Sequence, residues 1–360
     1  MARGSKRAGQ GGAAGTQSWR WMTPGDARLA VRGLAWSGEN GGGFARLPAR
    51  AEGRVPDEVW RLAQCPAGAR VAFRSDTTGL AVRVTNSDAG VMNHMAGAGS
   101  NGLSLYCGRP GGMRYWATAR PSPESPSFES VLFQGVPKER REFRLYLPLY
   151  KPMLSLEIGV AKGARLLPPS PNALDKPVVF YGTSITQGGC ASTAGSDFVS
   201  SVGRVLDLDV VNLGFSGSGR GEPVMAELVS EIDAALYVLD YAANADAATF
   251  HRNLPRFYRI IRKRRPKTPI LLTTTVCFSG FDYSFERKAT TERKRDVVFE
   301  FYARQRRRGD RDLHLVDGFG LIPFGTDAAY VDGVHPTDHG FQMMADRLAP
   351  QIQQILLRSV

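Results

Sequence analysis

The chain has 360 residues, of which 42% are hydrophobic, and a formal net charge of +12 at pH 7. This length exceeds the size at which a single hydrophobic core usually keeps growing, so more than one domain is expected. No stretch of about 18 uninterrupted apolar residues is present, which argues against a transmembrane helix, and the four cysteines are too scattered to indicate a zinc site or a disulfide framework.

The first 17 residues are rich in Gly, Ala, Ser, Arg and Lys and contain no apolar stretch. This composition predicts a disordered lead and not a signal peptide, because too little apolar surface is available to offset the entropy of ordering. We therefore expect a cytoplasmic protein.

Residues 18–165 contain several segments in which apolar and polar residues alternate, among them 80–85, 143–147 and 154–160. Such alternation is typical of half-buried strands. Turn-rich stretches at 87–90 and 109–112 separate them, and no long helical pattern intervenes. The sequence predicts a jelly-roll-like β-sandwich here, followed by a Pro-rich linker at 166–175.

Residues 176–360 show a different pattern, in which short apolar runs alternate with helix-length segments. Strands are predicted at about 177–181, 208–213, 235–240, 270–276 and 312–317. Between the third and fourth, Phe250, Leu254, Phe257 and Ile261 recur at helical spacing and predict a helix with one buried face. This order favours an α/β domain with a flavodoxin-like, doubly wound parallel sheet, whose ligand crevice lies at the carboxyl ends of the strands.

The first of these strands is followed by Tyr181-Gly-Thr-Ser184, which places Ser184 on a strand-to-helix turn. Such a turn exposes the hydroxyl while backbone N–H groups point toward developing negative charge, as a catalytic serine requires. Taken alone, the motif is more typical of a helix N-cap than of a catalytic serine.

Near the C-terminus, Asp332 and His335 stand three residues apart in Asp-Gly-Val-His-Pro. A serine hydroxyl is a poor nucleophile until a base takes its proton, and an imidazole is a good base when a carboxylate fixes its tautomer. We expect His335 to be the base and Asp332 its partner, and His339 to be a surface residue.

Two further blocks follow the second and third predicted strands. Gly217 lies in Asn212-Leu-Gly-Phe-Ser-Gly217, and Asn244 ends the stretch that begins at Leu236. With the backbone N–H of Ser184, the Gly217 N–H and the Asn244 amide would form a three-donor oxyanion hole. Each residue alone also fits a turn or a helix cap, but four such blocks in one order favour the catalytic interpretation.

The four blocks resemble those of the SGNH, or GDSL-like, hydrolase family. The resemblance implies Ser184 as nucleophile, Gly217 and Asn244 as oxyanion donors, and the pair Asp332 and His335. This chain departs from the pattern in having Gly-Thr-Ser for Gly-Asp-Ser and two alanines before Asn244. Gly102-Leu-Ser-Leu-Tyr106 likewise resembles the Gly-x-Asp-Leu-Tyr strand of the N-terminal domain of two-domain members, with Ser104 in place of the aspartate.

The positive charge also raises the question of nucleic-acid binding, through basic runs at 262–267 and 304–308. Both runs end predicted helices, where cations are favoured by the helix dipole, and no aromatic residues are interleaved with them. We expect no nucleic-acid or membrane partner. A basic surface suits an anionic substrate, with Arg220 as a candidate contact.

The resemblance implies acyl transfer through an acyl-serine intermediate, and members of this two-domain group include both carbohydrate esterases and natural-product acyltransferases. The sequence favours an intracellular O-acyltransferase that moves an acyl group from acyl-CoA, a co-substrate, to a hydroxyl group of a natural product. A carboxylesterase or carbohydrate O-deacetylase with the same triad is the alternative, and a non-enzymatic binding module is less favoured. Neither a metal nor a bound cofactor is expected.

Overall fold

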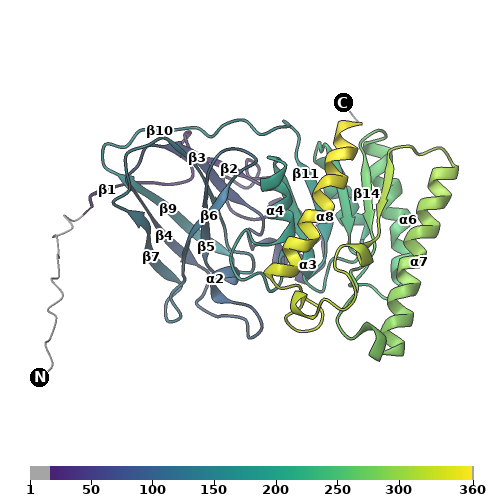
Figure 1. Ribbon diagram of the computed structural model, residues 1–360. Coiled ribbons are helices and arrows are strands. Elements are labelled where there is room, and N and C mark those ends of the chain that lie inside the picture. The colour runs from purple at the N-terminus through teal and green to yellow at the C-terminus, as the bar shows by residue number, and fades with distance from the viewer. Residues whose placement is uncertain (1–16, 359–360) are drawn as a thin grey trace, which may run out of the picture.

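The structure is a computed structural model that describes residues 17–358 (Figure 1). The predicted disordered lead therefore lies outside the described residues, except for Gln17. Within residues 17–358, no helix combines the length and apolar composition needed to cross a membrane.

Two antiparallel sheets form the first part of the chain, and their facing sides bury one hydrophobic core, as the β-sandwich prediction requires. The four-stranded sheet has the order β1 (Trp19–Met22), β9 (Met153–Ala161), β4 (Gly79–Asn86), β7 (Ser127–Gln134). The six-stranded sheet has the order β10 (Leu166–Leu167), β3 (Arg70–Ser75), β8 (Arg141–Tyr146), β5 (Leu103–Cys107), β6 (Arg114–Ala119), with β2 (Ala30–Arg32) also paired to β3. The range predicted as linker thus begins with a short strand.

Strand alternation predicts most of the buried positions of the sandwich, but not Leu154. Leu154 is 66% exposed, and its neighbour Met153 is buried instead. The register between β4 and β9 shifts at this point, where Thr85 pairs with Ser155 and Asn86 with Met153. The extra residue is a β-bulge, which turns the side chains before it to the opposite face.

The prediction of half-buried strands is also wrong for β8, because both of its faces are covered. Phe143 and Leu145 face the sandwich core, while Arg144 and Tyr146 are buried against the second part of the chain. Arg144 forms an ion pair with Asp207. The outer face of the six-stranded sheet is therefore an internal interface.

The second part of the chain contains a five-stranded parallel sheet. Its order is β12 (Val210–Gly214), β11 (Val178–Gly182), β13 (Leu236–Asp240), β14 (Ile270–Thr273), β15 (Leu313–Val316). In chain order this is 2-1-3-4-5, the flavodoxin-like order that the sequence predicts, with a crevice expected between the first and third strands.

Helices cover both faces of this sheet (Figure 1). One face carries α4 (Phe198–Val205) and α8 (Asp338–Leu357), and the other carries α5 (Pro223–Glu231), α6 (Ala247–Arg264) and α7 (Phe285–Arg307). The predicted apolar stripe of α6 is buried. Shorter helices are α1 (Asp57–Ala63), α2 (Gly97–Ser100) and α3 (Ser184–Gln187), with 3-10 turns at Ala49–Ala51, Phe281–Tyr283, Gly318–Gly320 and Asp327–Ala329.

The segment from Trp36 to Ala63 lies between the sandwich strands β2 and β3 in sequence but packs against the parallel sheet, in one hydrophobic cluster with α5, α6 and α7. Within it, Arg46 is only 1% exposed. Its guanidinium donates hydrogen bonds to the carbonyl oxygens of Leu62, Cys65, Asn212 and Gly214, at 2.7–3.0 Å. An arginine from the N-terminal half therefore holds the carboxyl end of β12.

Candidate active site

Ser184 is the first residue of α3, directly after the turn that ends β11. Thr183 caps the helix, and Thr183 and Thr186 form a reciprocal capping box. The Thr186 hydroxyl also donates to the Asp240 carboxylate at 2.9 Å. A methyl group on Gly182 would lie 1.9 Å from the Thr186 oxygen, so only glycine allows this close approach of turn and strand.

The three residues predicted as a triad meet at the carboxyl edge of the sheet. The Nε2 atom of His335 lies 2.8 Å from Ser184 Oγ, and its Nδ1 atom lies 2.7 Å from Asp332 Oδ2. Both distances are within hydrogen-bond range. The serine and the histidine are 151 positions apart in sequence, so the fold alone brings them together.

Asp332 is fixed by the backbone as well as by the imidazole. Its Oδ1 atom accepts the N–H groups of Val334, at 3.0 Å, and His335, at 2.8 Å. Burial raises the pKa of the Asp332 carboxyl, but the hydrogen bonds from His335 and Val334 outweigh it and lower the pKa to about 2. The carboxylate is therefore charged at neutral pH and can stabilise an imidazolium.

Three groups are predicted to donate to the oxyanion: the N–H groups of Ser184 and Gly217 and the amide of Asn244. In the described residues, no acceptor takes a hydrogen bond from the backbone N–H of Ser184 or Gly217. Gly217 has φ +68°, and nothing within 4 Å would meet a Cβ there. The Asn244 amide donates one hydrogen bond to the Phe215 carbonyl at 3.2 Å, which leaves its second N–H. Ser184 and Asn244 line the cavity beside the serine, whereas Gly217 does not, so the three-donor oxyanion hole stays a prediction.

The cavity beside Ser184 has a volume of about 450 Å³ and lies between the serine turn, the Asn244 loop and the start of α7. Outside α7 and its N-cap, the residues that line it are Thr183, Ser184, Ile185, Ala243, Asn244, Phe278 and Val334. Ser284, Glu286, Arg287, Thr290, Thr291 and Lys294 line the side formed by α7. Arg220 is not among the lining residues. Its side chain is exposed and its Nε atom donates to the Gly217 carbonyl at 3.1 Å, so it braces the turn.

Lys294 is a positioning residue that the sequence does not reveal. It is 7% exposed, and its ammonium donates to the carbonyl oxygens of Ala243 and Ala245, at 3.0 Å each. Burial lowers the pKa of the Lys294 ammonium, against the opposing effect of Asp246. The two bonds clamp the residues on either side of Asn244, in a loop that has alanines where the family pattern has glycines.

The sandwich part of the chain also contacts the serine turn. The Tyr150 hydroxyl donates to the Ser184 carbonyl at 3.3 Å, and the Gln187 amide donates to the Leu149 carbonyl at 3.1 Å. Sequence reasoning missed Tyr150 because it carries no motif and lies 34 residues before the serine.

His94 and Cys190 lie beside the triad, whereas His339 is exposed on α8. The rings of His94 and His335 have centroids 5.9 Å apart. Burial, and then the Asp332 charge, raises the pKa of the Cys190 thiol to about 11, so this thiol is neutral at pH 7 and does not compete as a nucleophile. All four cysteines are free.

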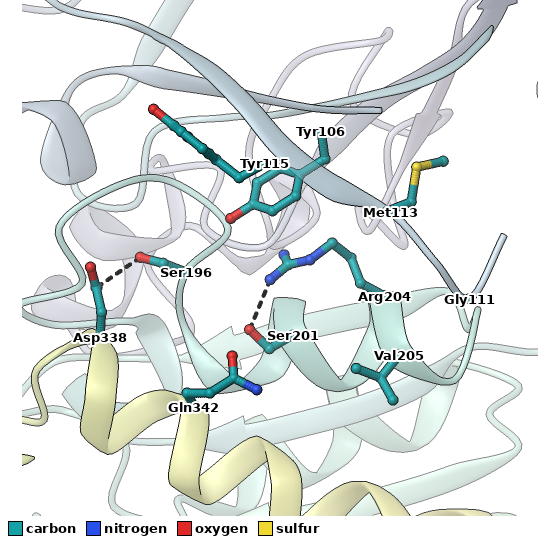
Figure 2. Close-up of a pocket in the computed structure, with 10 residues that line it drawn as sticks. All are labelled: Tyr106, Gly111, Met113, Tyr115, Ser196, Ser201, Arg204, Val205, Asp338 and Gln342. Carbon is teal, nitrogen blue, oxygen red and sulfur yellow. Dashed lines mark hydrogen bonds between the residues drawn. The ribbon is translucent and has the colours of Figure 1, made fainter. Parts of the chain in front are cut away.

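A second pocket, of about 330 Å³, lies where the sandwich meets α4 and α8 (Figure 2). Arg204 stacks over the Tyr106 ring, 4.0 Å from its centroid, and donates to Ser201 at 2.9 Å. The Asp338 carboxylate accepts a hydrogen bond from Ser196 at 2.9 Å. No residue of the triad lines this pocket. Asp338 anchors the loop at 190–197 through Ser192 and Ser196, and Ser196 lines the pocket.

The fold and this edge of the sheet define an enzyme of acyl-ester chemistry, of the SGNH type. The chain belongs to the GDSL-like Lipase/Acylhydrolase family, which matches residues 175–353, and residues 19–166 match the N-terminus of Esterase_SGNH_hydro-type, named GxDLY. The N-terminal match holds despite Ser104, whose hydroxyl pairs with that of Thr118 at 3.0 Å.

Several solved structures share the fold. A GDSL-like lipase candidate from Bacteroides ovatus ATCC 8483 is 27% identical, with a TM-score of 0.86, over 94% of this chain and 98% of that one. Salicylyl-acyltransferase SsfX3 from a tetracycline biosynthetic pathway is 23% identical, with a TM-score of 0.75, over 94% and 97%. A family two carbohydrate esterase from Clostridium thermocellum is 16% identical, with a TM-score of 0.56, over 82% and 94%. No curated protein matches the chain.

Proposed function

We propose that this enzyme transfers acyl groups through a covalent intermediate on Ser184. The observation that carries the proposal is the continuous chain of hydrogen bonds from Ser184 Oγ through His335 to Asp332, at 2.8 and 2.7 Å. Together with the Ser184 N–H, for which the described residues provide no acceptor, this arrangement supports nucleophilic catalysis.

In the proposed first step, Ser184 Oγ attacks the carbonyl carbon while His335 Nε2 takes the hydroxyl proton. The carbonyl oxygen becomes an oxyanion, which the N–H groups of Ser184 and Gly217 and the amide of Asn244 stabilise. As the intermediate collapses, the bond to the leaving group breaks and His335 returns the proton to that group. The ester of Ser184 remains.

In the second step, an acceptor hydroxyl gives its proton to His335 and attacks the acyl-serine. The new ester leaves, and the serine oxygen regains a proton from His335. Water as the acceptor gives hydrolysis, whereas an alcohol gives transfer, so the residues of the triad are the same for both reactions.

We propose that the physiological reaction is transfer from an acyl thioester, acyl-CoA, to a hydroxyl of a natural product in the cytoplasm. The similarity to a salicylyl-acyltransferase over 94% of the chain supports this choice. Arg287 at the cavity and the net charge of +12 also favour a donor that carries phosphates.

Ester hydrolysis is the second candidate. The likeness to carbohydrate esterases of family two supports it, as do the hydroxyl groups of Ser284, Thr290 and Thr291 along the cavity, which suit a polyhydroxylated substrate. In that case the sandwich and the triad would be used in the same way, with water as the acceptor.

One experiment tests both levels of the proposal. The full chain is incubated with a panel of acyl-CoA thioesters and simple esters, and the acyl adduct on Ser184 is sought by intact-mass and peptide mass spectrometry, with Ser184→Ala as the control. Hydroxyl acceptors are then added. An adduct that disappears into an acylated acceptor supports transfer, an adduct that yields only free acid at a rate independent of the acceptor supports hydrolysis, and an adduct formed equally on Ser184→Ala refutes the serine mechanism.

A further inference from the structure

Four side chains with metal-binding atoms gather at the active site, two of which have no part in the proposed acyl chemistry. They are His94, Cys190, Asp332 and His335, and one ligand atom of each lies within 4.8 Å of all the others. His94 comes from the loop between β4 and α2, and Cys190 from the loop after α3. Three separate segments of the chain therefore converge on one point.

The position of Cys190 is fixed by its surroundings. It is 6% exposed and has φ +72°, a left-handed conformation that few non-glycine residues adopt. Its thiol donates to the His94 carbonyl at 3.3 Å. Ser192 and Ser196 lie farther along the same loop, and both donate hydrogen bonds to Asp338 on α8. The Ser192 backbone N–H does so at 2.9 Å, and the bond from Ser196 is drawn in Figure 2. The sulfur thus points at the triad from an anchored loop.

The fourth ligand is free to adjust. His94 is exposed, and within residues 17–358 its Nδ1 atom forms a single hydrogen bond, with the neighbouring Asn93 amide oxygen at 3.0 Å. Tetrahedral zinc, with bonds of about 2.0–2.3 Å, needs ligand atoms about 3.3–3.8 Å from one another. Because the four ligand atoms lie within 4.8 Å of one another, closure on an ion requires the longest of these distances to shorten by about 1 Å, and the exposed His94 side chain can take up part of this movement.

The ligand set has a definite chemical preference. One thiolate, two imidazoles and one carboxylate suit a borderline or soft divalent ion, and neither Mg²⁺ nor Ca²⁺, which prefer oxygen ligands. Zn²⁺ binds all three ligand types at tetrahedral sites.

We propose that His94, Cys190, Asp332 and His335 bind one Zn²⁺ ion, which reversibly inactivates the enzyme. On binding, the Cys190 thiol releases its proton to solvent, and the ion takes a ring nitrogen of His335 and an oxygen of Asp332. The imidazole that would take the serine proton and the carboxylate that would stabilise the imidazolium are then both bound to the ion, so Ser184 is left without a base. The inhibition rests on the proposed function, whereas the binding does not.

Binding is tested first, on the full chain, without reference to activity. Equilibrium dialysis against buffered Zn²⁺ should give one ion per chain, and Co²⁺ in place of Zn²⁺ should give a thiolate-to-metal charge-transfer absorption. Cys190→Ser should abolish that absorption, and Cys190→Ser and His94→Ala should each weaken Zn²⁺ binding more than ~10-fold. The matched controls Cys107→Ser and His339→Ala should bind as the wild type does. A wild-type chain that binds no Zn²⁺, or Cys190→Ser that binds it unchanged, overturns the proposal.

Inhibition is tested next, with a fluorophosphonate probe that labels an activated serine. Stoichiometric Zn²⁺ should block labelling of the wild type, and EDTA should restore it. Labelling of Cys190→Ser and His94→Ala should continue at that Zn²⁺ concentration. Labelling of the wild type that continues with Zn²⁺ bound refutes the inhibitory role. A probe that labels no form even without metal instead contradicts the proposed function and leaves the dialysis and Co²⁺ results to decide the metal site.

Discussion

The replacement of Asp332 by asparagine separates the two tasks of this carboxylate. Its Oδ1 atom holds the backbone N–H groups of Val334 and His335, and its Oδ2 atom accepts the Nδ1–H of the imidazole. Asparagine has nearly the same shape but only one acceptor oxygen. If that oxygen keeps the two backbone bonds, the NH₂ group faces His335 Nδ1 and makes that nitrogen an acceptor. The ring proton then moves to Nε2, where it faces Ser184 Oγ and prevents proton transfer from the serine.

The size of the effect follows from the bonds that decide the tautomer. The productive tautomer of the variant lacks the bond to a charged acceptor, which contributes about 1.5–3 kcal/mol. It also lacks the new bond from the asparagine amide, about 1 kcal/mol. In addition, it brings the asparagine NH₂ against the Nδ1–H of His335, at a cost of about 1 kcal/mol. The total of about 3.5–5 kcal/mol corresponds to a loss of about 400-fold to 5,000-fold in rate. Asp332→Ala removes the carboxylate without fixing the wrong tautomer, so it should retain about tenfold more activity than Asp332→Asn.

The assay is kcat/KM for a p-nitrophenyl ester at pH 7.5, with thermal unfolding followed by circular dichroism to show that each variant is folded. Because hydrogen bonding lowers the pKa of Asp332 to about 2, the wild-type rate should show no titration of this carboxyl above about pH 4. A folded Asp332→Asn protein within tenfold of the wild type, or one that is more active than Asp332→Ala, would refute the tautomer argument.

Three further predictions concern the serine, the clamp on the Asn244 loop and a buried acid. Ser184→Ala should lower turnover at least ~10³-fold with an unchanged melting temperature, and activity within tenfold of the wild type would show that another residue is the nucleophile. Lys294→Met removes both bonds to the carbonyls flanking Asn244, so kcat should fall ~10–10²-fold, and this loss should vanish in an Asn244→Ala background; additive effects in the double-mutant cycle would contradict a positioning role. Burial raises the pKa of Asp240 to about 6, so the folded state keeps a proton that the unfolded chain releases above about pH 4, and stability falls as pH rises from 4 to 6. Urea unfolding should therefore show the wild type losing about 2 kcal/mol relative to Asp240→Asn between pH 4 and pH 7, and a constant difference would contradict the shift.

Local patterns were sufficient to predict the five parallel strands, the apolar stripe of α6 and the positions of Ser184, Asp332 and His335. These features depend on residues close together in sequence: periodicity marks a strand or a helix face, and a turn with glycine marks the end of a strand. The bulge at Leu154 escaped because one extra residue inverts the alternation that the prediction relies on.

Contacts between distant segments left no comparable pattern. Lys294 sits on a helix about 50 residues beyond the loop that it clamps, and His94 comes from a loop of the sandwich 241 positions before His335. Likewise, Arg144 lies in an alternating strand and would be expected to face solvent, yet its partner Asp207 is in the second half of the chain. Such pairs depend on how the two halves dock, which periodicity does not encode.

The course of Trp36–Ala63 bears on how this protein unfolds. Because that segment fills the same core as α5, α6 and α7, and Arg46 within it holds the end of β12, the catalytic half does not enclose a complete core when the chain is cut at residue 166. Loss of structure in one half exposes apolar surface of the other, which couples their free energies. The chain should consequently melt in a single cooperative transition. Its catalytic half should not fold when it is expressed alone, in contrast to proteins whose domains are joined only by a linker.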